Sequence, residues 1–591
     1  MRHFTTTTEN GGLDRLIKEV GEAEKKTRFE SKLFHVYAGI SDEETLTELM
    51  AKISKAFPDA PIVGSQSGGE MHGGERKELV VVVSCLAFEK SKVEVVTYDD
   101  LSGNEREIGR TLRRETNRRL SQDLKAVEIL LPGALLNTSE TYEELGKADP
   151  DVLIFGGYAG NDDLDLEGTF VMANGEILQN SLVATFYFGS DLHVNASKSA
   201  GWQRLGLPLK ITKANGNVLN EIDGMPAAEA YEKYLNLKND EKFAENTNEF
   251  PIAAYVNGEE LLRHTNAVLA DGSLQLAGNM ETGWEAYLTF GNPSGIIERV
   301  NSRLVEASAF APEAILIYSC YVRKVFWERF ASVEIAPFSE LAPAAGFYTF
   351  GEVLRNMRSS DIMEYNVTML TILMREGEAA ERTAPAPKID DDALTGQASM
   401  IRRLAELVSS SAAEVQTAYR KLEEANGRLQ YASEHDHLTG LFNRGKTDEA
   451  IENMLERTAK AGGLSSLIMF DVDRFKRIND DFGHKAGDDV LRKFSSILRM
   501  EADSMRGFAG RVGGEEFYVL LPNCETSEAV EFAEKTRRII ETTDFGIVGK
   551  VTASAGVTGT DGREDRRTLC SRVDSAMYAS KNGGRNRVSV A

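Results

Sequence analysis

A glycine pair between two short apolar segments near the C-terminus most constrains how this chain can fold. Residues 508–512 and 517–521 have the composition of short strands, and Gly513 and Gly514 lie between them. Two-residue turns that match the twist of paired strands need positive φ, which glycine adopts without penalty, so the pattern predicts a β-hairpin. The bare backbone at its tip also lets a large ligand approach closely, and two acidic residues follow at once.

A second apolar segment supplies further carboxylates. Residues 464–470 read Leu-Ser-Ser-Leu-Ile-Met-Phe and lead into Asp471, Val472 and Asp473. This pattern is typical of a buried strand that delivers acids at its C-terminal end, where open α/β sheets bind ligands. If this strand neighbours the hairpin, Asp471 and Glu515 converge, and such carboxylates bind Mg²⁺ together with substrate phosphates. Two such ions can hold both oxygens of an in-line displacement at phosphorus.

These segments resemble the GGDEF family of diguanylate cyclases, which join two GTP molecules into cyclic di-GMP. The residues Arg-Val-Gly-Gly-Glu-Glu-Phe at 511–517 are similar to the family signature. Four further motifs fit in order, at residues 435–444, 471–480, 482–488 and 579–586. Five ordered motifs make the resemblance specific, whereas two glycines followed by two acids would by themselves be a weak signal.

The resemblance implies a role for each residue that falls on a family motif. The implied ligands of Mg²⁺, or of Mn²⁺ as the alternative, are Asp471, the Val472 carbonyl, Glu515 and Glu516. The implied substrate-binding residues are Phe475, Asn479, Asp488, Gly513, Gly514, Lys581 and Arg585. The implied catalytic residues are Glu515, which accepts the proton of the attacking 3′-hydroxyl, and Lys476, which neutralises charge on the triphosphate.

Two pairs among these residues have expected geometries. Asn479 and Asp488 are expected to read guanine, because an amide and a carboxylate complement its ring N–H and exocyclic amine. Lys581 and Arg585 would lie one helical turn apart if a helix that begins at Asp574 extends that far. Each basic residue also has an ordinary interpretation as a solvated surface charge.

The sequence departs from the family at one regulatory site. Many members carry Arg-x-x-Asp shortly before the signature, and the matching positions here read Ser504, Met505, Arg506 and Gly507. Both key residues are missing, so we expect feedback inhibition by the product through that site to be weak.

Length, charge and cysteine usage exclude several classes of protein. The 591 residues predict about three or four domains, and a net charge of −24 argues against a general nucleic-acid-binding surface. The four cysteines are Cys85, Cys320, Cys524 and Cys570. They show no metal-ligand spacing, so a reduced protein is expected. No apolar run approaches the roughly 18 residues that span a bilayer and no apolar signal core is present, so we expect a cytoplasmic protein without a membrane span.

The N-terminal half alternates strands with helices, which predicts an α/β sheet. Strands are expected at residues 33–38, 61–64, 79–87, 126–131 and 152–155. Helices are expected at residues 42–57, 104–124 and 139–145. Residues 1–30 are polar and are expected to be partly disordered or to form a short helix. Residues 212–249 are expected to be polar and helical, and 314–318 to form a buried strand.

Turns rich in small residues follow two of these strands, at the sheet edge where ligands bind. Residues 61–70 and 155–157 resemble the FIST domain, and residues 346–352 and 366–370 are similar to the end of its C-terminal half. That family is thought to bind small ligands upstream of signalling outputs, which implies an unidentified small-molecule ligand; plain tight turns are the alternative. The candidate ligand-binding residues are Ser65, Ser67, Gly68, Cys320 and Arg323. A buried structural thiol is the alternative interpretation of Cys320.

A heptad pattern precedes the cyclase-like segment. Apolar or small residues recur in steps of three and four at Ile401, Leu404, Val408, Ser411, Val415, Ala418, Leu422, Ala425, Leu429 and Ala432. This spacing predicts a two-stranded parallel coiled coil, and hence a homodimer through residues 397–433; a helix packed on its own domain is the alternative. Prolines and charges at 376–396 predict a flexible linker before it.

These features predict a multidomain α/β and α+β protein. The expected parts are a polar segment at 1–30, a FIST N-like α/β region at 31–212, a FIST C-like half at 213–375, a linker at 376–396, a coiled coil at 397–433 and an α+β cyclase domain at 434–591. The sheet of that last domain is expected to contain antiparallel strands. The predicted function is a sensor-regulated diguanylate cyclase in which two domains, each holding one GTP, face each other about a twofold axis. The alternatives are a silent module that binds GTP or cyclic di-GMP, and a FIST-centred interaction protein.

Overall fold

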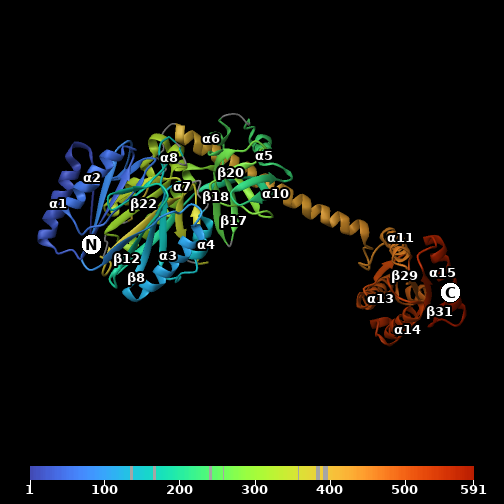
Figure 1. Ribbon diagram of the computed structural model, residues 1–591. Helices are drawn as coiled ribbons and strands as arrows, with labels where there is room; N and C mark the ends of the chain where they lie inside the picture. The colour runs from blue at the N-terminus through green and yellow to red at the C-terminus, as the bar shows by residue number, and fades with distance from the viewer. Residues whose placement is uncertain are drawn as a thin grey trace. The chain divides into compact units, whose positions relative to one another are not determined.

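The computed structural model describes residues 1–133, 138–163, 165, 168–238, 242–256, 258–356, 359–380, 386–389 and 397–591. The chain forms two compact units, Met1–Gln416 and Thr417–Ala591 (Figure 1). None of the described helices combines the length and the apolar character that crossing a bilayer requires.

Three six-stranded sheets make up most of the first unit. The first runs in the order β1 (Arg2–Thr7), β6 (Val81–Phe88), β2 (Ser31–Ala38), β3 (Ile62–Gln66), β10 (Val171–Ala173) and β11 (Glu176–Leu178). The second runs β7 (Lys92–Tyr98), β12 (Leu182–Phe188), β8 (Leu124–Leu131), β9 (Leu153–Tyr158), β24 (Glu352–Arg355) and β25 (Ile362–Tyr365). The third runs β13 (Leu192–Ser199), β26 (Met369–Glu376), β22 (Ala314–Cys320), β23 (Ala344–Thr349), β4 (Glu70–His72) and β5 (Glu75–Lys77).

The three sheets share one plan, so this unit contains a threefold internal repeat. In each sheet one parallel pair lies among antiparallel neighbours, namely β2–β3, β8–β9 and β22–β23. In each parallel pair, a glycine of the second strand lies opposite a branched aliphatic residue of the first strand. These pairs are Gly64 with Val36, Gly156 with Ile129 and Gly346 with Ile317. The chain then crosses to another sheet, where it forms the terminal hairpin. Each sheet is therefore completed by a hairpin from a neighbouring repeat.

A buried polar cluster lies where these sheets pack together. The Glu128 carboxylate on β8 accepts hydrogen bonds from Tyr318 at 2.5 Å and Tyr187 at 2.6 Å, and His35 Nε2 lies 3.1 Å away. All four side chains are buried. The surrounding apolar core takes residues from all three sheets, which ties the repeats into one unit.

Helices cover the outer faces of the sheets. The first sheet packs on α1 (Gly12–Lys26) and α2 (Glu43–Ala56), the second on α3 (Glu105–Arg119) and α4 (Ser139–Leu145), and the third on α7 (Pro293–Phe310), α8 (Tyr321–Trp327) and α9 (Ser332–Leu341). Helix α2 begins at its N-cap Asp42, whose side chain accepts from the Thr45 N–H, and buries Leu46, Met50 and Ile53 on one face. The predicted helices at 42–57 and 139–145 and all five predicted strands of this half are confirmed.

For residues 1–30 the expected helix is present, whereas the expected disorder was wrong. They form β1, which pairs with β6, and α1, which buries Leu16 and Val20. The many polar residues hide this order, because β1 is an edge strand with one face toward solvent and α1 is amphipathic.

A further sheet is inserted within the third repeat, between β13 and α7. Its order is β18 (Glu259–Arg263), β17 (Ile252–Val256), β21 (Glu285–Gly291), β14 (Trp202–Asn215), β15 (Val218–Ile222), β20 (Leu274–Leu276) and β19 (Thr265–Val268), with β16 (Met225–Pro226) paired to β15. Helices α5 (Ala227–Leu235) and α6 (Phe243–Thr247) accompany it. The prediction of a helical stretch over 212–249 was therefore wrong up to residue 226, where alternating polar residues belong to half-exposed antiparallel strands.

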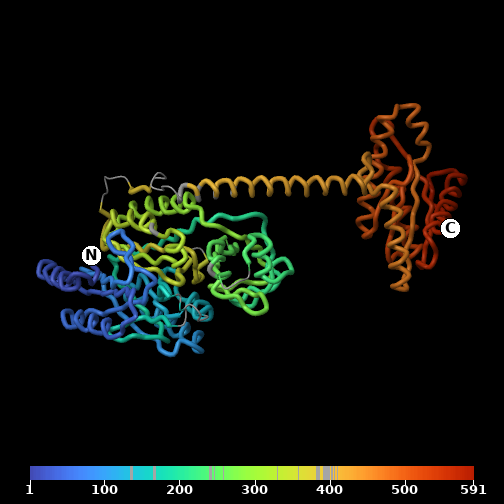
Figure 2. Tube along the Cα trace, turned by 90° about the horizontal axis from the view of Figure 1, so that it is seen from above, coloured from blue at the N-terminus to red at the C-terminus, as the bar shows by residue number. Residues whose placement is uncertain are grey.

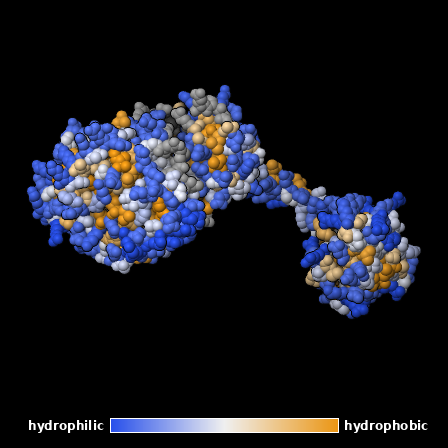
Figure 3. Space-filling view, in the orientation of Figure 1, coloured by the Kyte–Doolittle hydropathy of each residue, from blue (hydrophilic) through white to orange (hydrophobic). Residues whose placement is uncertain are grey.

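The linking helix α10 (Gln397–Glu434) covers the predicted heptad and is drawn as one unbroken coil in Figure 2. Its seam residues Val415, Leu422 and Leu429 are 55%, 57% and 68% exposed, and Figure 3 shows apolar side chains on the surface of this helix. Within the predicted linker, residues 381–385 and 390–396 lie outside the described part of the chain. Ile389 belongs to the same predicted linker but is buried, and its N–H and its carbonyl both form hydrogen bonds with the Asn301 side chain on α7.

The second unit is a five-stranded sheet with helices around it. The strand order is β28 (Phe508–Arg511), β29 (Glu516–Leu521), β27 (Ser465–Val472), β30 (Ala553–Thr560) and β31 (Val588–Val590). The helices are α11 (Arg444–Ala461), α12 (Phe475–Phe482), α13 (His484–Ser504), α14 (Thr526–Thr542) and α15 (Arg566–Asn582). All strand pairs except β30–β31 are antiparallel, which confirms the predicted sheet and places the hairpin directly beside the acid-bearing strand.

Candidate functional site

The predicted carboxylates converge at the end of the central strand. Asp471 on β27 lies directly opposite Glu516 on β29, and the Val472 N–H donates to the Glu515 carbonyl at 3.3 Å. Asp471 and Val472 are buried, whereas Glu515 and Glu516 are half-buried. Like charges directly opposite on paired strands destabilise a sheet, so this arrangement calls for a compensating cation.

Lysine 581 supplies part of that compensation. Its ammonium lies 2.6 Å from the Asp471 carboxylate. Burial and, to a lesser extent, the neighbouring Glu515 and Glu516 raise the pKa of Asp471, while Lys581 opposes the rise, so that the pKa is about 6. The carboxyl group therefore lies in a field that disfavours its charge, and a cation bound beside it would favour the charged form.

The residues present fit a magnesium ion held partly by substrate. Among the described residues, no three His, Cys, Asp or Glu side chains gather closely enough to form an all-protein metal cage. Mg²⁺ does not require one, because it keeps several waters and is bound by one or two carboxylates together with substrate phosphates. Asp471 and the two glutamates after the turn provide this hard-oxygen set next to solvent.

The turn that carries the glutamates differs in detail from its prediction. Residues 512–515 connect the two strands, and neither Gly513 nor Gly514 has positive φ. A four-residue connection does not need the mirror-image geometry of a two-residue turn, which is why the expected conformation was wrong while the hairpin was right. The Arg511 guanidinium holds the loop by donating to the Gly514 carbonyl at 2.7 Å and pairing with Asp436 at 3.0 Å.

The two residues expected to read guanine lie together on consecutive helices. Asn479 is on α12 and Asp488 is near the start of α13, and both are half-buried. A Cβ on Gly487 would lie 1.9 Å from Asn479 Oδ1, so glycine at 487 leaves room for the Asn479 side chain next to the residue that precedes Asp488. The sequence signal for this constraint is the glycine that directly precedes Asp488.

The remaining predicted residues are distributed around this centre. Lys476 is exposed on α12, and Phe475 is buried in the domain core, where it supports that helix. Lys581 lies on α15, but the helix ends at Asn582 and Arg585 follows in the left-handed region with φ of 67°. The condition for Lys581 and Arg585 to lie one helical turn apart is therefore not met, since the glycines at 583 and 584 end the helix.

A pocket of about 390 Å³ extends the site along α15. It includes Glu516 and Lys581, and sequence reasoning missed its other charged lining residues, Arg444, Asp448, Arg566 and Asp574.

Sequence reasoning also assigned no role to Asp473. It accepts from Thr552 at 2.7 Å, Ser554 at 2.6 Å and the Asn586 N–H at 3.0 Å, and so anchors the loop after α15 to the central strand.

The five candidate ligand residues of the first unit are enclosed. Ser65, Ser67 and Cys320 are buried, and a Cβ on Gly68 would lie 2.5 Å from the Tyr321 ring. Arg323 is fully buried and forms an ion pair with Glu334. They lie where the segments that connect one sheet to the next come together. There the Gly68 N–H donates to the Tyr348 carbonyl and the Gly160 N–H donates to the Gln66 carbonyl, both at 3.0 Å.

Comparison with protein families agrees with this geometry. Residues 433–587 match the model described as diguanylate cyclase, GGDEF domain. Residues 32–225 match the FIST N domain and residues 227–355 the FIST C domain. The chain is thus a GGDEF-domain protein with FIST N and FIST C domains in its N-terminal part.

Its curated relatives share the GGDEF part. The chain is 37% identical over 194 residues to diguanylate cyclase DgcP of Pseudomonas aeruginosa, 32% of this chain and 28% of that protein. It is 38% identical over 177 residues to diguanylate cyclase DgcM of Escherichia coli, covering 30% and 42%, and 37% identical over 159 residues to response regulator PleD of Caulobacter vibrioides, covering 26% and 35%. The chain thus spans less than half the length of each of these relatives.

Part of the chain is also similar to a solved structure. It contains the coiled coil and GGDEF domain of DgcB from Caulobacter crescentus in complex with cyclic di-GMP. The identity is 29%, the match covers 31% of this chain and 99% of that chain, and the TM-score is 0.30.

Proposed function

We propose that the protein is a diguanylate cyclase that condenses two GTP molecules into cyclic di-GMP and two pyrophosphates. The observation that carries the proposal is the juxtaposition of Asp471, Glu516 and Lys581 at the sheet end, with the Asn479–Asp488 pair in the same domain. The names of the curated relatives support it.

The residues of the site divide the work of nucleotidyl transfer. Asn479 and Asp488 bind the guanine, and Lys581, Lys476 and Arg585 attract the triphosphate. Glu515 accepts the proton of the 3′-hydroxyl, and Asp471, the Val472 carbonyl, Glu515 and Glu516 hold Mg²⁺ or Mn²⁺. When bound, the ion supplies Lewis-acid polarisation of the phosphate and neutralises charge in the transition state.

A single domain cannot close a cyclic product from two equivalent halves, so two copies must face each other. The exposed apolar seam of α10 supports a parallel dimer through residues 397–433, since exposed residues in heptad spacing are stabilised by pairing with a second helix. We propose that the FIST domains bind a small molecule and that this helix transmits the effect to the cyclase domains.

The competing function is a module that binds GTP or cyclic di-GMP without turnover. The substitution Glu515→Gln separates the two, because it removes the charge and the basic oxygen while preserving shape. We expect product formation from GTP and Mg²⁺ to fall by at least about 100-fold with GTP binding and the melting temperature retained. Wild-type protein that binds GTP but makes no cyclic di-GMP would favour the silent module, and near-normal synthesis by the variant would refute the role of Glu515.

A further inference from the structure

A pocket of about 450 Å³ lies in the first unit between helix α4 and the inserted sheet. Its walls include Tyr142 and Lys147 near α4, Leu261 and Arg263 on β18, Trp284, and Glu364 on β25. None of the residues on which the FIST resemblance rests lines it. Pockets of this size accommodate small organic ligands.

The base of this pocket holds a buried cation without a carboxylate partner. Arg263 is 5% exposed, and its guanidinium donates to the Leu262 carbonyl at 3.0 Å, the Glu364 carbonyl at 3.1 Å and Asn366 Oδ1 at 3.1 Å. These three acceptors and a fourth, the Asn279 carbonyl 3.4 Å from Arg263 Nε, are neutral, and no carboxylate of the described residues lies within ion-pair distance. A buried charge is normally paired with an opposite one. Here the compensating carboxylate, Glu364, lies beyond ion-pair distance, so the guanidinium can still pair with the anion of a ligand.

The local backbone is adapted to this arginine. Gly278 has φ of 102°, and a Cβ there would lie 2.6 Å from Arg263 Nε. Glycine therefore provides both the left-handed conformation and the space that the guanidinium occupies.

Glu364, whose backbone carbonyl accepts from Arg263, also lines the pocket. The Glu364 carboxylate is half-buried and accepts from the Tyr158 hydroxyl at 3.4 Å, which in turn accepts from Tyr142 at 2.6 Å. Glu364 offsets the Arg263 charge from beyond ion-pair distance, and it lines the pocket together with the polar residues Ser139, Asn217 and Asn279. Such an acceptor suits a ligand that carries a hydrogen-bond donor.

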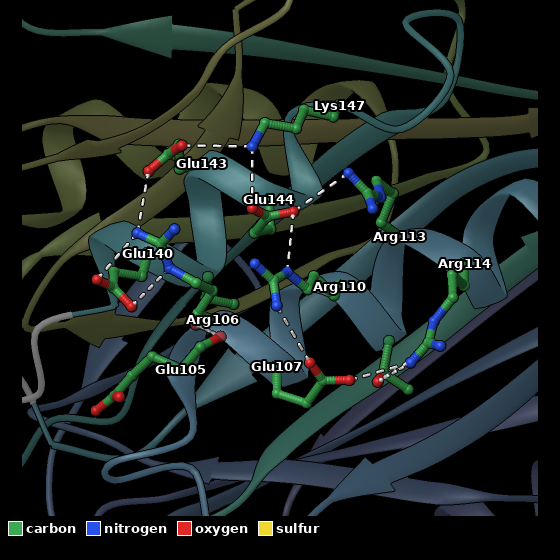
Figure 4. A network of polar contacts seen from close by, with 12 residues as sticks. Glu105, Arg106, Glu107, Arg110, Arg113, Arg114, Glu140, Glu143, Glu144 and Lys147 are labelled. Atoms are coloured by element: carbon green, nitrogen blue, oxygen red, sulfur yellow. Dashed lines mark hydrogen bonds and ion pairs between the residues drawn. The ribbon is translucent and has the colours of Figure 1, made fainter.

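The other cation of the pocket is already paired. Lys147 lies 3.3 Å from Glu143 and 3.0 Å from Glu144, within the ion-pair network that joins α3 to α4 in Figure 4. Arg110 and Arg113 also approach Glu144 in this network, at 3.7 and 3.2 Å. The network fixes the α4 wall, and it leaves the guanidinium of Arg263 as the group to which a ligand anion would bind.

We propose that this pocket binds a small organic carboxylate that also carries a hydrogen-bond donor. The carboxylate contacts Arg263, the donor faces Glu364, and the half-buried ring of Trp284 with Leu261 covers the apolar body. Binding depends only on the first unit's own residues and is measured without cyclase activity, so failure of the proposed cyclase function would leave this inference intact.

Calorimetry and thermal shift on the full-length protein test it with lactate and mandelate as probes. The uncharged controls are lactamide and mandelamide, which keep the hydroxyl and the body but lack the charge. We expect at least one acid to bind and to raise the melting temperature, and neither amide to do so. Binding by neither acid, or equal binding by acid and amide, would overturn the inference.

Variants locate the bound probe. Arg263→Gln should weaken binding of the acid probe by about tenfold or more, because a charge-assisted hydrogen bond is lost. Asn217→Trp should block the pocket while keeping Arg263, which preserves the test if Arg263→Gln does not fold. Arg303→Gln, which removes a guanidinium from α7 outside the pocket, is the matched control and should bind as wild type. Unchanged affinity in a folded Arg263→Gln or in Asn217→Trp would place the probe elsewhere and contradict the proposal.

Discussion

At the scale of single residues, the site depends on two close approaches. Asp471 and Glu516 lie opposite each other across paired strands, and Asn479 contacts α13 at Gly487. Both follow from motif residues that can be named in the sequence. The anchoring role of Asp473 could not be predicted, since it depends on hydroxyls from Thr552 and Ser554, which sequence places far away.

Substitution of the guanine readers tests the nucleotide assignment. We expect Asn479→Ala and Asp488→Ala each to weaken GTP binding by about tenfold and to reduce the preference for GTP over ATP, because each removes a hydrogen bond to the base. Competition binding measures both quantities. Asp489→Ala, an exposed neighbour on α13, is the control, and unchanged selectivity in the two test variants would refute the assignment.

A buried glutamate in the first unit predicts a pH effect on stability. Burial raises the pKa of Glu352 from 4.5 to about 8, although the Thr349 and Thr368 hydroxyls donate to it. Between these values the folded protein holds a proton that the unfolded chain has lost, so stability falls as the pH rises toward 8. Glu352→Gln cannot titrate at this position, so its melting temperature should fall less between about pH 5 and 8 than that of the wild-type protein.

Exposed Glu298→Gln on α7 is the control for this pH effect and should follow the wild-type curve. A pH dependence of Glu352→Gln identical to wild type would show that this carboxyl does not carry the effect.

At the scale of elements, strands and helices with strong periodicity could be predicted, and mixed polar segments could not. The hairpin, β27, α2 and α10 follow from apolar spacing and capping. β1 and β14 were missed because half-exposed edge strands alternate polar and apolar residues, which resembles a loop or an amphipathic helix. Pairing with strands that are distant in the sequence determines the secondary structure of such segments.

The linking helix gives a prediction at this scale. Changing Leu422 and Leu429 to glutamate should separate a coiled coil locally, because each buried leucine contributes roughly 1.5–3 kcal/mol and like charges would then face each other. We expect loss of the dimer in light scattering and lower turnover, with GTP binding by each domain retained.

Two glutamates placed off the seam provide the matched control for this helix. Gln416→Glu with Arg420→Glu should leave the dimer and the turnover as in wild type. If the seam variant kept wild-type turnover at low protein concentration, α10 would not be the element that aligns the two active halves.

At the scale of the whole molecule, the threefold repeat of the first unit was invisible in the sequence. Beyond one equivalent glycine, the repeats share strand order and register more than residues: the positions before Val36, Ile129 and Ile317 hold His35, Glu128 and Leu316. Each hairpin also belongs to a different sheet from the strand before it. Fold class and domain order could therefore be read from motifs, whereas this repeat and the Arg263 pocket required the three-dimensional structure.

The central claim is that the protein makes cyclic di-GMP, and product stoichiometry tests it most directly. Purified wild-type protein is incubated with GTP and Mg²⁺, and nucleotides and pyrophosphate are quantified by chromatography with mass detection. The account predicts one cyclic di-GMP and two pyrophosphates for every two GTP consumed, with the rate per chain rising with protein concentration until the dimer is complete. GTP that binds and is recovered unchanged, or is hydrolysed without cyclic di-GMP, would contradict it.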